Sequence, residues 1–247
     1  MSGKYIIAIF IIFFLNECYA QKIEQEIVLV NIGSLDRSGV AKEIALICSL
    51  NPKVISIDVT FAGKKPKDIE LIESLWNCRA NLIVPSRSHN IGNGQFYFVT
   101  TTEPEFLPSN STTGFVDAEL ENDERHTLKK FIVKQKDSFG KNKYHFSIKT
   151  AMSFDSLKTI NFIKEHANII DIDFKNKKRL FKSFSSQEIL NGSVTKKDIE
   201  GKIVMIGFLG PGNEDKFVTP YNNDPNEPDM YGLEYLANVV AQVLEDK

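Results

Sequence analysis

Three polar side chains are candidates for a ligand site, because each one follows a segment with the pattern of a buried strand. Asp58 lies at the carboxyl end of the predicted strand 54–59, and Asp215 and Thr219 lie in the loop after the predicted strand 201–207. Ligands of open α/β sheets bind beyond the carboxyl ends of parallel strands. The sequence therefore predicts Asp58, Asp215 and Thr219 as ligand-binding residues. The alternatives are a solvated or helix-capping role for Asp58 and a turn-bracing role for Asp215 and Thr219.

Other chemistry finds little support in the sequence. The glycine-rich segment 207–212 could direct backbone N–H groups at an anion, but it lacks the Gly-Lys-Ser/Thr ending of a phosphate-binding loop. The acidic segment 119–124 could hold a cation weakly, although such runs are typical of solvated surface. We expect no metal site, no cofactor and no catalytic residue, since the four histidines lie in unrelated segments without ligand spacing: His89, His126, His145 and His166.

The elements that would position Asp58 alternate along the first third of the chain. Apolar runs at 27–32, 54–59 and 81–85 predict strands, and periodic apolar residues at 39–50 and 67–77 predict the helices between them. Strands that are apolar throughout are typical of a parallel sheet covered on both faces. We expect an α/β fold with a mainly parallel, partly mixed sheet, helices on both faces and a single domain.

The remainder of the chain is less regular. The polar segment 101–125, rich in Ser, Thr, Asn and acids, is predicted to be a mobile loop. Further strands are expected at 95–99, 130–133, 169–174 and 201–207, and further helices at 144–156, 184–190 and 232–244.

The N-terminus has the organisation of a secretory signal. Lys4 provides a positive charge, residues 5–15 an apolar run, and Cys18 and Ala20 small side chains where a signal peptidase cleaves. We expect residues 1–20 to be a signal peptide and the mature chain to be periplasmic or secreted. The main alternative is an uncleaved N-terminal anchor, and a lipid-modified Cys18 is a weaker one because the acid Glu17 precedes it.

Composition and cysteines fit an extracytoplasmic domain. The chain has a net charge of −2 with 25% charged residues, which gives no indication of nucleic-acid binding. After signal removal, Cys48 and Cys78 remain, each near the end of a predicted helix. Both sulfurs could therefore lie at one level of the fold. A disulfide and two buried free thiols are both consistent with this pattern.

Several segments, in order, resemble the CHASE domain of the second type. Residues 51–61 contain a proline before a strand that ends in aspartate and phenylalanine, and 114–117 are followed by an acid and paired lysines. Residues 184–192 are similar to the short helix that the family places before its glycine-lysine strand. The C-terminal signature is similar too, at 201–207, 215–220 and 230–238, so the resemblance covers roughly 26–244.

The resemblance implies a function. This family is an extracytoplasmic sensory module associated with histidine kinases and cyclases. We therefore expect a sensory or ligand-binding domain that is not an enzyme, with an unknown extracytoplasmic ligand and a membrane-bound kinase or cyclase as candidate partner. An envelope-associated structural or protein-interaction module without a small ligand is the alternative, and a secreted hydrolase with an unrecognised site is a third hypothesis.

The chain also departs from the family pattern. Tyr231 precedes Gly232 where the family commonly has Pro-Gly, and Leu236 stands where it commonly has histidine. The first strand ends in Asn31 where aspartate is frequent. Few residues follow the closing helix, so we expect a domain without its own output domain.

Overall fold

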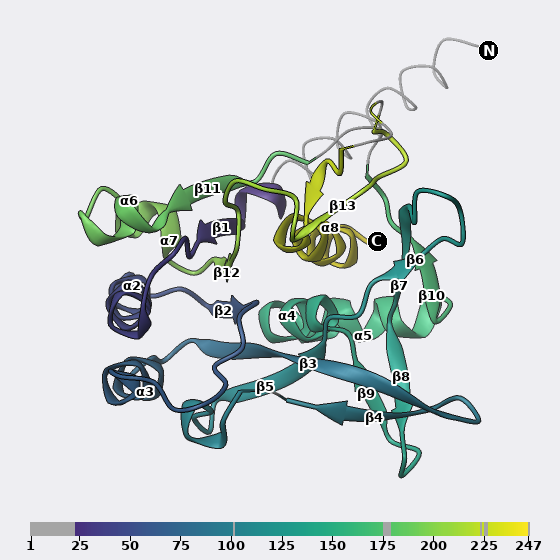
Figure 1. Cartoon of the computed structure of the whole chain (residues 1–247), viewed down its shortest axis with the longest axis horizontal. Helices are drawn as coiled ribbons and strands as arrows, with labels where there is room; N and C mark the ends of the chain where they lie inside the picture. The colour runs from purple at the N-terminus through teal and green to yellow at the C-terminus, as the bar shows by residue number, and fades with distance from the viewer. Residues whose placement is uncertain (1–22, 101, 175–178, 223, 225–226, 247) are drawn as a thin grey trace, which may run out of the picture.

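The computed structural model describes residues 23–100, 102–174, 179–222, 224 and 227–246 (Figure 1). The predicted signal peptide therefore lies outside the described residues. The described chain forms a large mixed sheet whose parallel part has the strand order β11-β1-β12-β2-β3-β5. These strands are β11 (Lys182–Ser185), β1 (Ile27–Asn31), β12 (Ile203–Gly207), β2 (Val54–Ile57), β3 (Asn81–Gly92) and β5 (Ser111–Phe115).

Helices cover both faces of this parallel sheet (Figure 1). Side chains alternate along β1: Val28 and Val30 pack in the core beneath α2 (Arg37–Ser49) and α3 (Asp68–Trp76). Ile27 and Leu29 pack in the opposite core beneath α4 (Phe146–Phe154) and α8 (Gly232–Glu245). Every residue of β2 and β12 is buried, which explains their continuous apolar runs. The predicted α/β fold class is thus confirmed.

The remaining helices complete these two layers. On the face of the sheet that α4 and α8 cover, α5 (Ser156–Glu165) packs against both of these helices. On the α2 side, α6 (Ser186–Leu190) packs against α2, and α7 (Lys196–Ile199) leads into β12. The Ser185 side chain and Glu188 form a capping box at the start of α6, so the predicted serine cap is confirmed.

Three further strands extend the sheet beyond β3, namely β4 (Gln95–Val99), β8 (Lys134–Asp137) and β9 (Asn142–Tyr144). The pairing of β3 with β4 and of β8 with β9 is antiparallel, and the pairing of β4 with β8 is parallel. The chain reverses through Gly92, Asn93 and Gly94, all with positive φ, and β4 pairs with the second half of β3. Glycine and asparagine adopt that conformation at low cost. Separate small sheets comprise β10 (Ile169–Asp171), β7 (Leu128–Ile132) and β6 (Glu119–Leu120), and β13 (Lys216–Phe217) with β14 (Met230–Tyr231).

The prediction of one loop over 101–125 was wrong. This segment contains a 3-10 helix (Pro104–Phe106), β5 and β6, and β5 pairs in parallel with β3. Its polar sequence concealed the strand. Gly114 is required there, because a Cβ on Gly114 would lie 2.5 Å from the Phe146 Cα, where α4 begins.

Two helical boundaries also differ from the prediction. The expected helix 144–156 ends at Phe154, because Asp155 is extended and caps a further helix, α5, that the sequence analysis did not foresee. The expected helix 184–190 begins only at Ser186, since the residues before it form β11 at the edge of the sheet.

Cys48 and Cys78 are joined in the structure. A disulfide links Cys48, in the last turn of α2, with Cys78, just after α3, and their Cα atoms are 5.4 Å apart. The bond fixes the ends of two neighbouring helices on one face of the sheet.

Candidate functional site

The carboxyl ends of the central strands surround a cavity with two adjoining hollows of about 310 and 250 Å³. We call this cavity the edge pocket. Both hollows are lined by Asp58, Arg87, Val116 and Asp215. The first is completed by Val59, Thr60, Pro85 and Ser86, and the second by Asp117, Phe217, Gly232, Tyr235 and Leu236. Residues from five segments of the chain thus converge where ligands of α/β sheets bind.

Three of the pocket's charged residues are positioned by the sheet. Asp58 directly follows β2, and its N–H donates to the Ile206 carbonyl over 2.7 Å, which extends the ladder between β2 and β12. Arg87 lies on β3, beyond Pro85. Asp117 follows β5 and accepts a hydrogen bond of 2.9 Å from the Ser88 N–H.

The fourth charged residue, Asp215, is packed against the start of α8. Its carbonyl accepts a 2.9 Å hydrogen bond from the Gly232 N–H. A Cβ on Gly232 would lie only 3.0 Å from Asp215 Oδ1, so glycine at this position admits the carboxylate. The pocket therefore includes the first turn of α8, where a helix carries partial positive charge.

Acidic side chains outnumber basic ones in the lining of the pocket. Burial, and secondarily the charge of Asp215, raise the pKa of Asp58 to about 7, while Arg87 opposes this rise. Burial also raises the pKa of Asp215. Neither carboxylate accepts a hydrogen bond from a described residue, and Arg87 is exposed and forms no ion pair with one. Two carboxylates and one guanidinium thus line the same cavity without a direct partner in the described part of the chain.

Tyr235 contributes a hydroxyl from the second turn of α8. Its side chain is 1% exposed, and Oη lies 3.2 Å from Nε2 of the buried His145. Burial lowers the pKa of His145 to about 3, so the ring is neutral. His145 Nδ1 accepts from the Ser147 N–H, which assigns the ring proton to Nε2 as donor to Tyr235. The hydroxyl hydrogen of Tyr235 is then left for another acceptor.

The structure brings two of the three predicted residues together. Asp58 and Asp215 line the same cavity, whereas Thr219 lies outside it. The Thr219 N–H and Oγ1 each bond to the Asp229 carboxylate over 2.8 Å. Thr219 therefore braces its loop, as in the structural alternative stated for it.

Sequence reasoning did not identify Arg87, Asp117 or Tyr235. The predicted third strand ended at Pro85, so Arg87 was not placed at the sheet edge. Asp117 belonged to a segment assigned as loop, although the glycine-acid stretch 114–117 was part of the family resemblance. Tyr235 depends on the tertiary packing of α8, for which no local pattern exists.

Other motifs are explained by structural roles. Asn31 Oδ1 accepts from the N–H groups of Gly33 and Leu209, over 3.1 and 3.0 Å, so it braces the turn after β12. In the acidic segment 119–124, Glu121 forms an ion pair with Lys130 over 3.0 Å. Within the described ranges, no group of three or more His, Cys, Asp or Glu side chains is arranged to hold a metal ion.

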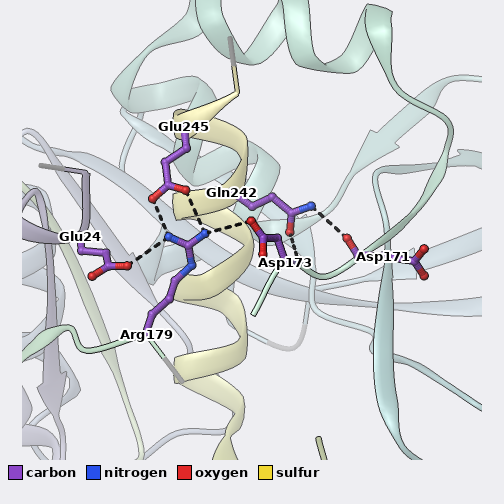
Figure 2. A network of polar contacts seen from close by, with 6 residues as sticks. All are labelled: Glu24, Asp171, Asp173, Arg179, Gln242 and Glu245. Carbon is purple, nitrogen blue, oxygen red and sulfur yellow. Dashed lines mark hydrogen bonds and ion pairs between the residues drawn. The ribbon is translucent and has the colours of Figure 1, made fainter. Parts of the chain in front are cut away.

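The opposite end of α8 carries a second charged cluster (Figure 2). The Arg179 side chain is 1% exposed and pairs with Glu245 through two contacts of 2.5 and 3.0 Å. It also contacts Glu24 over 3.3 Å and Asp173 over 3.9 Å. We call these four residues the Arg179 cluster. It joins the last turn of α8 to the beginning of the described chain.

Fold and pocket together describe an α/β domain with a charged cavity at one end of its closing helix. The model of the family described as the CHASE2 domain matches residues 21–247. The chain belongs to the CHASE2 family, whose members are extracytoplasmic sensory domains of signalling proteins. No curated protein and no solved structure matches it. In the part of the chain that the structure describes, no helix has the length and apolar character needed to cross a bilayer.

Proposed function

We propose that this domain binds a small extracytoplasmic ligand in the edge pocket and that α8 passes the response to a membrane-bound kinase or cyclase. The observation that carries the proposal is the position of α8. Its first turns line the pocket with Gly232, Tyr235 and Leu236, and its last turn, at Glu245, lies in the Arg179 cluster. One helix thus connects the pocket with both ends of the described chain.

The packing of α8 supports a concerted response. The Ser147 hydroxyl donates a hydrogen bond of 2.8 Å to the Leu236 carbonyl, and most other α8 residues are buried. A helix of 14 residues is about 21 Å long. Because a buried helix moves as a unit against its neighbours, a shift of the first turn would reach the last turn. Ligand binding would then change the population of two α8 positions.

The location of the domain follows from the same proposal. The predicted signal at 1–20 would place the mature chain in the periplasm or outside the cell, where the family's sensory domains operate. A kinase or cyclase in another polypeptide would receive the response. Its docking would involve the last turn of α8, which the Arg179 cluster joins to Glu24 near the start of the described chain.

The proposal is tested by ligand-dependent thermal stabilisation of the purified chain. A ligand that binds the native state raises the melting temperature. We expect a compound that stabilises the wild-type chain to lose this effect in Asp58→Asn and Asp215→Asn. Glu214→Gln, in the same loop but outside the pocket, is the matched control and should retain it. Stabilisation that persists in both aspartate variants would contradict the proposal and favour the interaction module.

A further inference from the structure

We infer that the ligand of the edge pocket is a small zwitterion of the amino-acid class. Its ammonium group would lie between Asp58 and Asp215, and its carboxylate would lie against Arg87. The inference rests on the proposed function, since it assumes that the edge pocket holds the sensed molecule.

The two aspartates favour a ligand with a cationic group. Both carboxylates line both hollows of the pocket, and no described residue donates a hydrogen bond to either. Asp117 adds a third acid whose Oδ2 already accepts from the Ser88 N–H. Like charges this close disfavour each other, and an ammonium group with three N–H donors relieves the repulsion while satisfying both carboxylates.

Arg87 favours a ligand that also carries an anionic group. It lines both hollows and is near enough to influence Asp58, yet it pairs with none of the described acids. A guanidinium presents a planar fork of donors that matches a carboxylate. Tyr235 also lines the second hollow, on the α8 side of the cavity. The ligand therefore carries an acceptor as well as a cation.

The dimensions and lining of the pocket limit the size of this molecule. Hollows of about 310 and 250 Å³ lie near the lower end of typical small-molecule sites. Val116, Phe217 and Leu236 provide an apolar wall for a short side chain. Three acids against one arginine disfavour polyanions such as nucleotides.

The test uses the standard L-amino acids as probes, each added singly to the purified full chain up to about 10 mM, with binding measured by calorimetry. Each amino acid that binds is then compared with its decarboxylated amine and its deaminated acid. We expect at least one to bind, and each analogue to bind at least about tenfold more weakly because one charged contact is lost. Asp58→Asn and Arg87→Gln should reduce the affinity by at least about tenfold. The controls Glu214→Gln and Arg79→Gln should retain it.

The outcomes separate the two proposals. If no amino acid binds, or if an amine analogue binds as tightly as its amino acid, the zwitterion inference is overturned. An amine that binds the wild-type chain but not Asp58→Asn would still support the edge pocket as the sensory site. A probe that binds Asp58→Asn and Arg87→Gln as well as the wild type binds elsewhere, which would contradict the proposed function itself.

Discussion

Acidic side chains lie near both ends of α8, but their electrostatic surroundings differ. At the last turn, Glu24, Asp173 and Glu245 surround Arg179, whose side chain is 1% exposed and whose two terminal nitrogens pair with them (Figure 2). At the first turn, Asp58 and Asp215 face a cavity that the exposed Arg87 also lines, and no described ion pair joins Arg87 to either aspartate.

This difference separates a structural cluster from a binding site. A buried arginine with several carboxylate partners holds segments together, and removal of one partner leaves buried charge behind. Carboxylates without partners instead retain unfavourable electrostatic energy that a ligand can relieve. The same residue types thus serve opposite purposes at the two ends of one helix.

The largest effect is expected from the Arg179 cluster. Arg179→Met would remove the buried cation that pairs with Glu24, Asp173 and Glu245, so the free energy of unfolding should fall by about 3 to 5 kcal/mol. Urea denaturation would measure the change. The exposed Arg79, changed to Met, is the control and should alter stability by less than about 0.5 kcal/mol. A loss below about 1 kcal/mol in Arg179→Met would mean that the cluster is not structural.

Glu43 on α2 gives an intermediate case, a buried carboxyl that has neither a partner nor a pocket. It is fully buried, both its oxygens lack hydrogen bonds within the described part of the chain, and burial raises its pKa from 4.5 to about 7. The pKa of Glu43 is higher in the folded state than in the unfolded state. The contribution of Glu43 to the free energy of unfolding is therefore complete below about pH 4.5 and is lost as pH rises to about 7.

We therefore expect stability to decline across this pH range by about 3 kcal/mol from Glu43 alone. Denaturation of the wild type and of Glu43→Gln at successive pH values tests this, since glutamine cannot titrate. The decline should be clearly smaller in the variant. Equal declines in both proteins would show that Glu43 is ionised in the folded chain.

The smallest effects concern the charges within the edge pocket. Asp215→Asn should lower the pKa of Asp58 below about 7, because it removes a repulsive charge, and Arg87→Gln should raise it. NMR titration of the side-chain carboxyl resonance reports both shifts. Glu214→Gln should leave the value unchanged. If neither pocket variant moves the Asp58 pKa, the three charges are not coupled through one cavity.

The sequence predicted the parallel centre of the fold well, for a physical reason. Strands β1, β2 and β12 are buried on both faces, so their apolar runs are continuous and their ends fall within two residues of the prediction. The strand β5 was missed because its first residues are polar and because its Gly114 satisfies a close approach to α4, a tertiary requirement without a local signature.

The site was predictable only in part, for the same reason. Asp58 follows an obvious strand, and the position of Asp215 follows from β12 being parallel. Arg87 belongs to the unforeseen second half of β3, and the hydrogen bond between Tyr235 and His145 joins residues 90 positions apart. Such long-range pairs arise from packing, which no single segment encodes.

The central claim is that a ligand in the edge pocket acts on the whole of α8. Hydrogen exchange by mass spectrometry, with and without an amino acid identified by calorimetry, tests it most directly. The account predicts altered exchange both in the first turns of α8, around Gly232 and Tyr235, and in its last turn around Glu245, with no change in Asp58→Asn. Altered exchange restricted to the first turns, with the last turn and residues 23–25 unaffected, would contradict it.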